Sequence, residues 1–129
     1  MAIERYQVEG APTPAGPYSH AVAAHGFLYT AGFGPVDPAT GERVGTDVAA
    51  QTRQVLRNVG TVLAAVGLGF GDVVKSTVHL ANVERDFGDF NAAYAEFFSA
   101  GYPVRTTVGS TLPGILVEID VVAAFPEAR

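Results

Sequence analysis

Apolar residues recur at helical spacing in two stretches of the chain. From Asp47 onward they lie three, four or seven positions apart, a pattern that predicts an amphipathic helix ending at Gly67. Thr46 or Asp47 can cap its first free amide groups. Aromatic residues repeat at a similar spacing further on and predict a second helix from about Asp86 to Ser99. The apolar positions of the first helix are Val48, Val55, Leu56, Val59, Val62, Leu63 and Val66.

Other stretches are short, β-branched or alternating, which is typical of strands. The dipeptide His25-Gly26 separates two of them and predicts a hairpin. In VVKSTVHL, alternation predicts that Val74 shares one face with Ser76, Val78 and Leu80. Turn-forming residues fill positions 33–46, which we expect to form a loop. The predicted strands cover residues 21–24, 27–30, 73–80, 104–108 and 115–125.

This order of elements predicts an α+β fold in one domain that spans residues 1–129. Two helices with one apolar stripe each are expected to pack on one face of a mixed sheet, as a two-layer sandwich. The opposite sheet face then stays bare. Because the strands are rich in apolar residues, a bare face predicts a homo-oligomer.

Composition and charge narrow the possible functions. The 129 residues are 48% hydrophobic and 16% charged, which fits a folded chain with some surface covered by other copies. The net charge is −5 and no basic run occurs, so we expect no nucleic-acid partner. Without cysteine there is no thiolate nucleophile and no sulfur-ligated metal, and the three histidines lack metal-binding spacing. We therefore expect no metal.

Membrane insertion and secretion are not expected either. No segment has enough uninterrupted apolar residues to span a bilayer. Glu4 and Arg5 stand where a secretory signal would carry its apolar stretch. We expect a cytoplasmic protein with no membrane partner.

Ionic groups in the apolar C-terminal third are the candidates for chemistry. Arg105 lies alone in YPVRTTV, and a guanidinium flanked by threonines is suited to grip a carboxylate with two parallel hydrogen bonds. The alternative is an ordinary surface arginine. Glu118 and Asp120 share one face of the last strand, where they need solvent, a cation or a subunit interface. Burial raises the pKa of a carboxylate and pairing with arginine lowers it, and the residue pattern does not rank these effects.

Six segments, in order, resemble one family, the reactive intermediate deaminases (RidA, or YjgF/YER057c/UK114). They are AGPYSHAV, AGFGPVDPATG, DVAAQTRQVLRNVGTVLAAVG, DVVKSTVHLANVERDFGDFNAAYAEFF, PVRTTV and LPGILVEIDVVA, and they cover nearly the whole chain from about residue 11. The resemblance implies a six-stranded sheet with two helices on one face, a chorismate-mutase-like homotrimer and active sites between subunits. It also implies hydrolysis of 2-imino and enamine acids, such as 2-aminoacrylate, to 2-keto acids and ammonia, without cofactor or metal.

The resemblance also assigns site residues. It implies that Arg105 binds the carboxylate of a small-molecule substrate and that Glu118 positions or activates water. It implies that Tyr18 and Asn91 line the cleft. The Thr107 hydroxyl can add a hydrogen bond to the bound carboxylate.

Three departures from the family pattern bear on the substrate. Ala31-Gly32 stands where a Ser-Gly pair is common, so a hydroxyl is lost while the backbone amides of the cleft remain. Phe33 makes the expected pocket wall more apolar, and Thr107 occupies a position that is often cysteine. Two alternatives therefore stay open: a deaminase of a larger imine, such as an aminomuconate-like dienamine, and a trimer that binds a small carboxylate without turnover.

Overall fold

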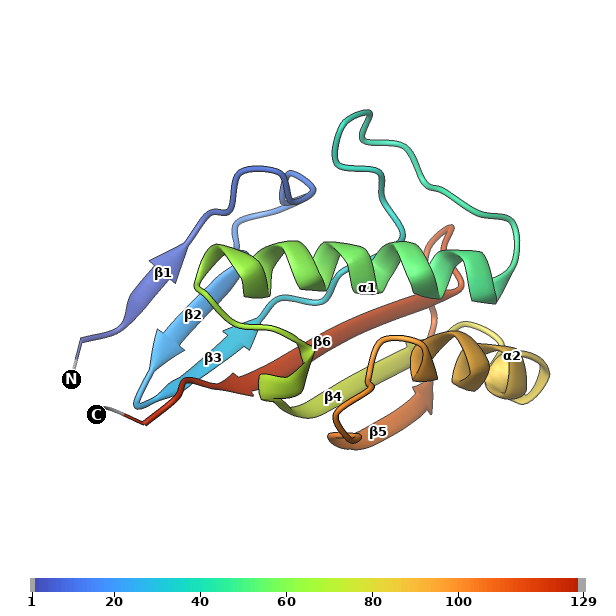
Figure 1. The fold of residues 1–129 in the computed structure, drawn as a ribbon. Coiled ribbons are helices and arrows are strands. Elements are labelled where there is room, and N and C mark those ends of the chain that lie inside the picture. The colour runs from blue at the N-terminus through green and yellow to red at the C-terminus, as the bar shows by residue number, and fades with distance from the viewer. Residues whose placement is uncertain (1, 128–129) are drawn as a thin grey trace.

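Six strands and two α-helices form two layers in the computed structural model, which describes residues 2–127 (Figure 1). The helices are α1 (Val48–Ala65) and α2 (Val83–Ala95), and a short 3-10 helix, η1 (Phe70–Asp72), precedes the fourth strand. The α+β class predicted from the sequence is confirmed. The strands are β1 (Glu4–Tyr6), β2 (Ala21–Ala24), β3 (Phe27–Thr30), β4 (Val73–Leu80), β5 (Val104–Gly109) and β6 (Val117–Ala124).

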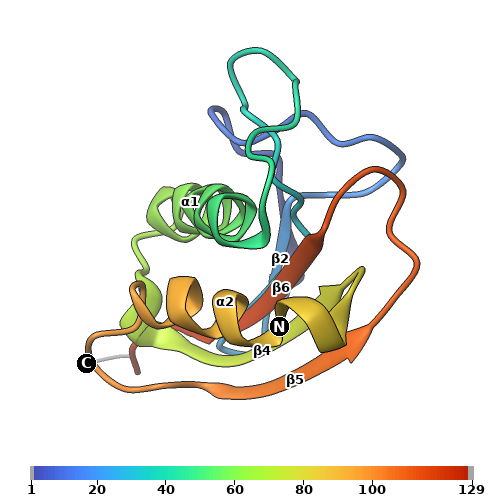
Figure 2. The ribbon, with the colours of Figure 1, turned by 90° about the vertical axis from the view of Figure 1, so that its right-hand side faces the viewer.

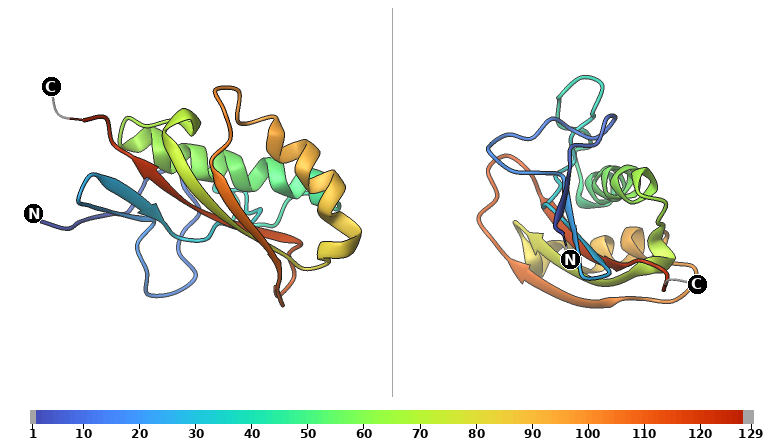
Figure 3. Two further views of the ribbon diagram at one scale, coloured as in Figure 1. Left: turned by 90° about the horizontal axis from the view of Figure 1, so that it is seen from below. Right: turned by 90° about the vertical axis from the view of Figure 1, so that its left-hand side faces the viewer.

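The sheet is mixed and has the strand order β1-β2-β3-β6-β4-β5. Only β4 and β5 run parallel, joined by the crossover through α2. Both helices lie on the same side of the sheet (Figure 2). The view from below shows the strands in front of the helices, so the opposite face carries no helix (Figure 3). The two-layer arrangement with one bare face is thus as expected.

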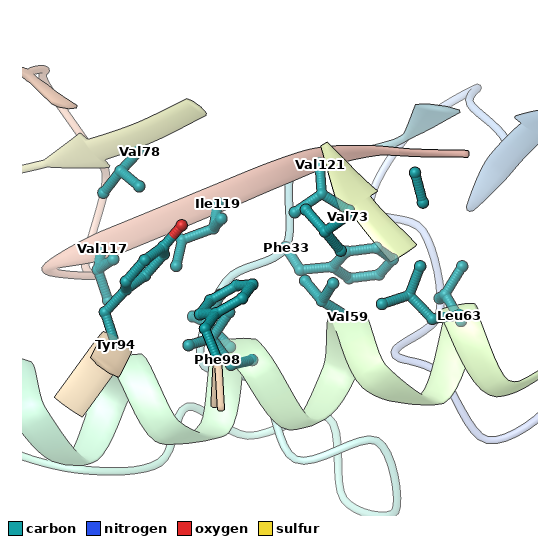
Figure 4. Packing of buried hydrophobic residues seen from close by; sticks show 14 of the residues in the cluster. Phe33, Val59, Leu63, Val73, Val78, Tyr94, Phe98, Val117, Ile119 and Val121 are labelled. Carbon is teal, nitrogen blue, oxygen red and sulfur yellow. The ribbon is translucent and has the colours of Figure 1, made fainter. Parts of the chain in front are cut away.

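Helix α1 begins and ends where its sequence predicts. The Asp47 carboxylate accepts a hydrogen bond of 2.8 Å from the Ala50 amide, and Gly67 takes the left-handed conformation with φ of 78° just beyond the helix. Its apolar stripe packs against β6 in the core, and each large side chain buried there stabilises the fold by about 1.5–3 kcal/mol (Figure 4). The fully buried members of the stripe are Val55, Leu56, Val59, Val62 and Leu63.

One face assignment in β4 is wrong. A β-bulge between Val73 and Lys75 breaks the alternation, so that Val73 is buried with 7% exposure and Val74 is 41% exposed. Beyond the bulge the predicted face is confirmed, because Ser76, Val78 and Leu80 are buried.

The predicted bounds of α2 are also wrong. The helix starts at Val83 after the N-cap residue Asn82, three residues before Asp86, and it ends at Ala95 instead of Ser99. Phe97 and Phe98 keep their packing role outside the helix, with edge-to-face contacts of 5.5 and 5.4 Å between ring centroids with Phe70. Aromatic spacing alone therefore extended the expected helix by one turn too many.

The bare sheet face mixes apolar and ionisable side chains. Tyr29 on β3 and Val104 on β5 are 46% and 68% exposed. Between them, Asp120 on β6 lies opposite Thr77 on β4. Partial burial raises the pKa of the Asp120 carboxyl above its ordinary value of 3.8, although the charges of His79 and Lys75 oppose this shift.

No helix within residues 2–127 has the length and apolar character needed to cross a membrane.

Replacing Asp120 with Asn is expected to stabilise the protein at neutral pH. When folding raises the pKa of a carboxyl group, ionisation of that group destabilises the folded state relative to the unfolded chain. The loss of stability develops as the pH rises from the unfolded pKa through the folded pKa, and it is complete above the folded pKa. The advantage of Asp120→Asn should be largest near pH 7 and shrink as the pH falls toward 4. Urea unfolding of both proteins across this pH range tests the prediction. If the variant is less stable than the parent at pH 7, the attraction between ionised Asp120 and the charges of Lys75 and His79 outweighs the cost of desolvating the Asp120 carboxylate.

Candidate active site

Arg105 points from the edge strand β5 toward the helix layer. It lies beside Ser76 in the parallel pairing of β4 and β5, and Ser76 faces the buried side of the sheet. The Arg105 Nη2 group donates a hydrogen bond of 2.8 Å to Oδ1 of Asn91 on α2. Its guanidinium also lies 4.9 Å from the ring centroid of Tyr94 and 5.2 Å from that of Phe90. Helix α2 therefore fixes both the position and the orientation of this cation.

Tyr94 is itself held by the sheet. Its hydroxyl lies 2.6 Å from the Ser76 Oγ atom. Burial raises the pKa of the Tyr94 phenol, while the hydrogen bond with Ser76 and the charge of Arg105 act in the opposite direction. The ring below the guanidinium is therefore a neutral phenol in a fixed place at physiological pH.

A pocket of about 660 Å³ opens at Arg105. Asn91 and Tyr94 form its polar side with Arg105, and Tyr102, Pro103 and two alanines of α2 complete its wall. Among residues 2–127 no carboxylate pairs with Arg105, since the ion pairs found there join Arg53 to Glu96 and Arg85 to Asp86. The N–H groups that do not bind Asn91 are thus available to an anionic ligand.

Glu118 lines a second pocket, of about 610 Å³. Its side chain lies along Gly32, where an added Cβ atom would stand 2.8 Å from the Glu118 Oε2 atom. The absence of a side chain at position 32 therefore makes room for the carboxylate. Tyr18, 45% exposed, lies on the rim of the pocket, and its hydroxyl accepts a hydrogen bond of 3.0 Å from the Ala15 amide.

Phe33 borders the Glu118 pocket but belongs mainly to the core. It is 4% exposed, and its ring packs between β6 and α1 near Val59 (Figure 4). Its backbone also pairs with Ile119, next to Glu118. The position matches the apolar wall expected from the sequence, and contact of the ring with a substrate stays a prediction.

Arg105 and Glu118 lie on opposite faces of the sheet in one chain. Glu118 is paired with His79 on the bare face, whereas Arg105 is paired with Ser76 on the helix side. Strand β4 lies between them, so their backbones are about 10 Å apart across the sheet and offset by about 10 Å along it. A single small substrate cannot reach both groups of the same chain.

The sequence-predicted site residues thus fall into two groups. Of the seven predicted residues, Arg105 and Asn91 line one pocket, and four others line the second. Thr107 lies on the helix side of β5 opposite Val78 and lines neither pocket. Among the described residues, no three His, Cys, Asp or Glu side chains come together in a group able to hold a metal ion. The four residues of the second pocket are Tyr18, Gly32, Phe33 and Glu118.

Comparison with known proteins identifies the family of this chain. The sequence model of the family described as endoribonuclease L-PSP matches residues 8–125. The chain belongs to this family, which is the RidA/YjgF family. A RutC family protein of Pyrococcus horikoshii is 47% identical over 117 residues, which cover 89% of this chain and 92% of the relative. A human protein named 2-iminobutanoate/2-iminopropanoate deaminase is 38% identical over 115 residues, with coverage of 88% and 83%.

Solved structures of RidA-family proteins have the same fold. The crystal structure of the YjgF gene product from E. coli superposes with a TM-score of 0.87 at 40% identity, covering 94% of this chain and 98% of that one. E. coli TdcF, solved with bound serine, also gives a TM-score of 0.87, at 36% identity, covering 95% of this chain and all of its own.

Two buried amide side chains of α1 hold the loops of the Glu118 pocket in this RidA-family chain, and sequence reasoning missed both. Asn58 donates hydrogen bonds to the carbonyl groups of Gly34 and Val36, at 3.1 and 2.8 Å. Gln51 donates one to the Gly45 carbonyl at 3.1 Å and accepts one from the Leu116 amide at 2.8 Å. The sequence does contain a signal for them. Gln51 and Asn58 lie seven residues apart, so they share the apolar face of the helix, where a polar side chain needs a hydrogen-bond partner.

His20 fixes the remaining loop of this pocket. Its Nδ1 atom accepts a hydrogen bond of 2.8 Å from the Val8 amide, so the proton is on Nε2, which donates to the Pro12 carbonyl at 2.6 Å. The ring also lies 5.8 Å from the Phe33 ring, between centroids. Loops from three parts of the chain are therefore tied to the core around Glu118.

Replacing Asn58 with Leu is expected to loosen the 33–46 loop. The substitution keeps the side-chain size but leaves the Gly34 carbonyl without a donor and the Val36 carbonyl with only the longer 3.4 Å hydrogen bond from Gln54 Nε2, which costs about 1–3 kcal/mol. Hydrogen exchange in the loop should rise more than in β6, and the urea midpoint should fall. Arg57→Leu, at the exposed neighbouring position, is the control. Equal exchange rates in the Asn58→Leu protein and the parent would contradict this role.

Proposed function

We propose that the protein hydrolyses 2-imino acids, and enamines that tautomerise to them, to 2-keto acids and ammonia. The observation that carries the proposal is the Arg105 pocket, in which an oriented and unneutralised guanidinium is suited to a substrate carboxylate. The similarity to the human deaminase supports this reading. TdcF with bound serine also supports it, because serine carries the same carboxylate next to an amino-bearing carbon.

The reaction has three requirements, and the proposal assigns a residue to the first and the third. The substrate carboxylate must be held, an enamine must gain a proton at carbon to become an imine, and water must add to the imine carbon. In the proposal, Arg105 holds the carboxylate and Glu118 takes a proton from water as its oxygen bonds to that carbon. The proton passes to the nitrogen of the resulting carbinolamine. The hydroxyl proton of the carbinolamine then moves to the nitrogen as the C–N bond breaks, so that the carbonyl forms and ammonia leaves.

We further propose that Arg105 and Glu118 of one site come from two chains of a homotrimer. Their placement on opposite faces of one sheet supports this, since a neighbouring copy can bring its Glu118 pocket to the Arg105 pocket of the first. The exposed apolar side chains on the bare face, Tyr29 and Val104 among them, give the copies a surface on which to pack.

Two other functions have weaker support. The description of the family model names an endoribonuclease, but a net charge of −5 with no basic cluster disfavours binding to RNA phosphates. A trimer that binds carboxylates without turnover explains Arg105 but leaves Glu118 without a role. The presence of Glu118 together with Arg105 favours catalysis over simple binding.

Replacing Arg105 with Ala is expected to lower kcat/KM for 2-iminobutanoate about 100-fold or more, because both charge-assisted hydrogen bonds to the carboxylate are lost. Ammonia release from freshly generated imine measures the effect. Arg57→Ala, which removes an exposed arginine of α1, is the matched control and should keep parent activity. Undiminished hydrolysis by a folded Arg105→Ala oligomer would refute the proposed role of Arg105.

A further inference from the structure

The Glu118 pocket contains a cation that the proposed reaction does not use. Of the residues that line this pocket, Arg43 is the one lysine or arginine and Glu118 the one aspartate or glutamate. The rest of the wall is largely apolar, with Val36 and Ile115 among its members. Arg43 is an exposed residue, so an anion can reach its guanidinium from solvent.

Three close approaches fix where Arg43 lies relative to Glu118. The loop after β3 runs along the segment before β6, so that Gly32 meets Glu118 and Gly34 meets Ile115. At the far end, the Arg43 guanidinium lies over Gly114, where an added Cβ atom would be 2.7 Å from Nη1. Gly114 and Glu118 are four residues apart, which an extended chain spans in at most about 14 Å.

The Arg43 guanidinium lies against Gly114 and is not neutralised. An added Cβ atom at Gly114 would stand 2.7, 2.8 and 3.1 Å from Nη1, Cζ and Nη2 of Arg43, so the guanidinium lies next to the Gly114 backbone. Within residues 2–127, neither ion pair involves Arg43. Its N–H donors therefore stay available at the outer end of the pocket.

We infer that Arg43 binds a second carboxylate, and that the preferred substrates are 2-imino dicarboxylic acids. This inference rests on the proposed function. With the reacting carbon at Glu118 and the first carboxylate at Arg105 of a neighbouring chain, the substrate side chain extends toward Arg43. A guanidinium takes a carboxylate at that end through two parallel hydrogen bonds. An uncharged side chain of similar length gains nothing there.

The test compares imines generated from glutamate and from methionine, which have side chains of similar length and differ in the terminal charge. The parent should prefer the glutamate-derived imine, and Arg43→Gln should lower the ratio of the two kcat/KM values about 10-fold or more, mainly through KM. Arg57→Gln, an exposed arginine of α1 outside the pocket, should leave the ratio unchanged. A ratio that is the same in the parent and Arg43→Gln would overturn the inference.

The two proposals fail in different ways. If the parent hydrolyses both imines without an Arg43-dependent preference, the second carboxylate site is refuted and the deaminase function stands. If it hydrolyses neither of these imines nor 2-iminobutanoate, the deaminase function is refuted, and calorimetric binding of 2-oxoglutarate and 2-oxobutyrate then decides on Arg43 alone. Loss of affinity in Arg43→Gln for 2-oxoglutarate only would support the site, and equal affinities in both proteins would refute it.

Discussion

The alternation of side chains along a strand is the constraint on which this protein depends. Residues paired across neighbouring strands share a face, so Arg105 follows Ser76 to the helix side and Glu118 follows His79 to the bare side. No loop movement changes this assignment, because the three strands are hydrogen-bonded along their length. The proposed reaction needs both groups at one small substrate, Arg105 at its carboxylate and Glu118 at the neighbouring carbon. In this proposal, catalysis therefore requires two chains to assemble.

Each half of the proposed site is positioned by a different helix of the same layer. Helix α2 serves the Arg105 half, where Asn91 and a cluster of aromatic rings orient the guanidinium. Helix α1 serves the Glu118 half indirectly, through Asn58 and Gln51, which hold loop backbone on either side of the pocket. The two helices thus position groups on both sides of a sheet while covering only one of them.

Much of the fold could be predicted from the sequence because it depends on local pattern. The α1 stripe and its caps, the β2–β3 hairpin and the alternation in β6 all follow from residues close together in the chain. The bulge at Val74 and the end of α2 could not, since they are decided by pairing and packing with distant residues. For the site, a family resemblance supplied residues but not their faces. Arg43 was missed because its position in the pocket depends on contact with Gly114, 71 residues away.

The most direct test of a site shared between chains is complementation. Arg105→Ala and Glu118→Gln proteins, each inactive alone, are unfolded, mixed in equal amounts and refolded, and mixed oligomers are verified by native mass spectrometry. In any closed ring, random assembly gives a site with both native groups in about one case in four. The account predicts that the mixture recovers about a quarter of the parent rate of ammonia release from 2-iminobutanoate. Mixed oligomers with no activity above that of the separate variants would contradict it.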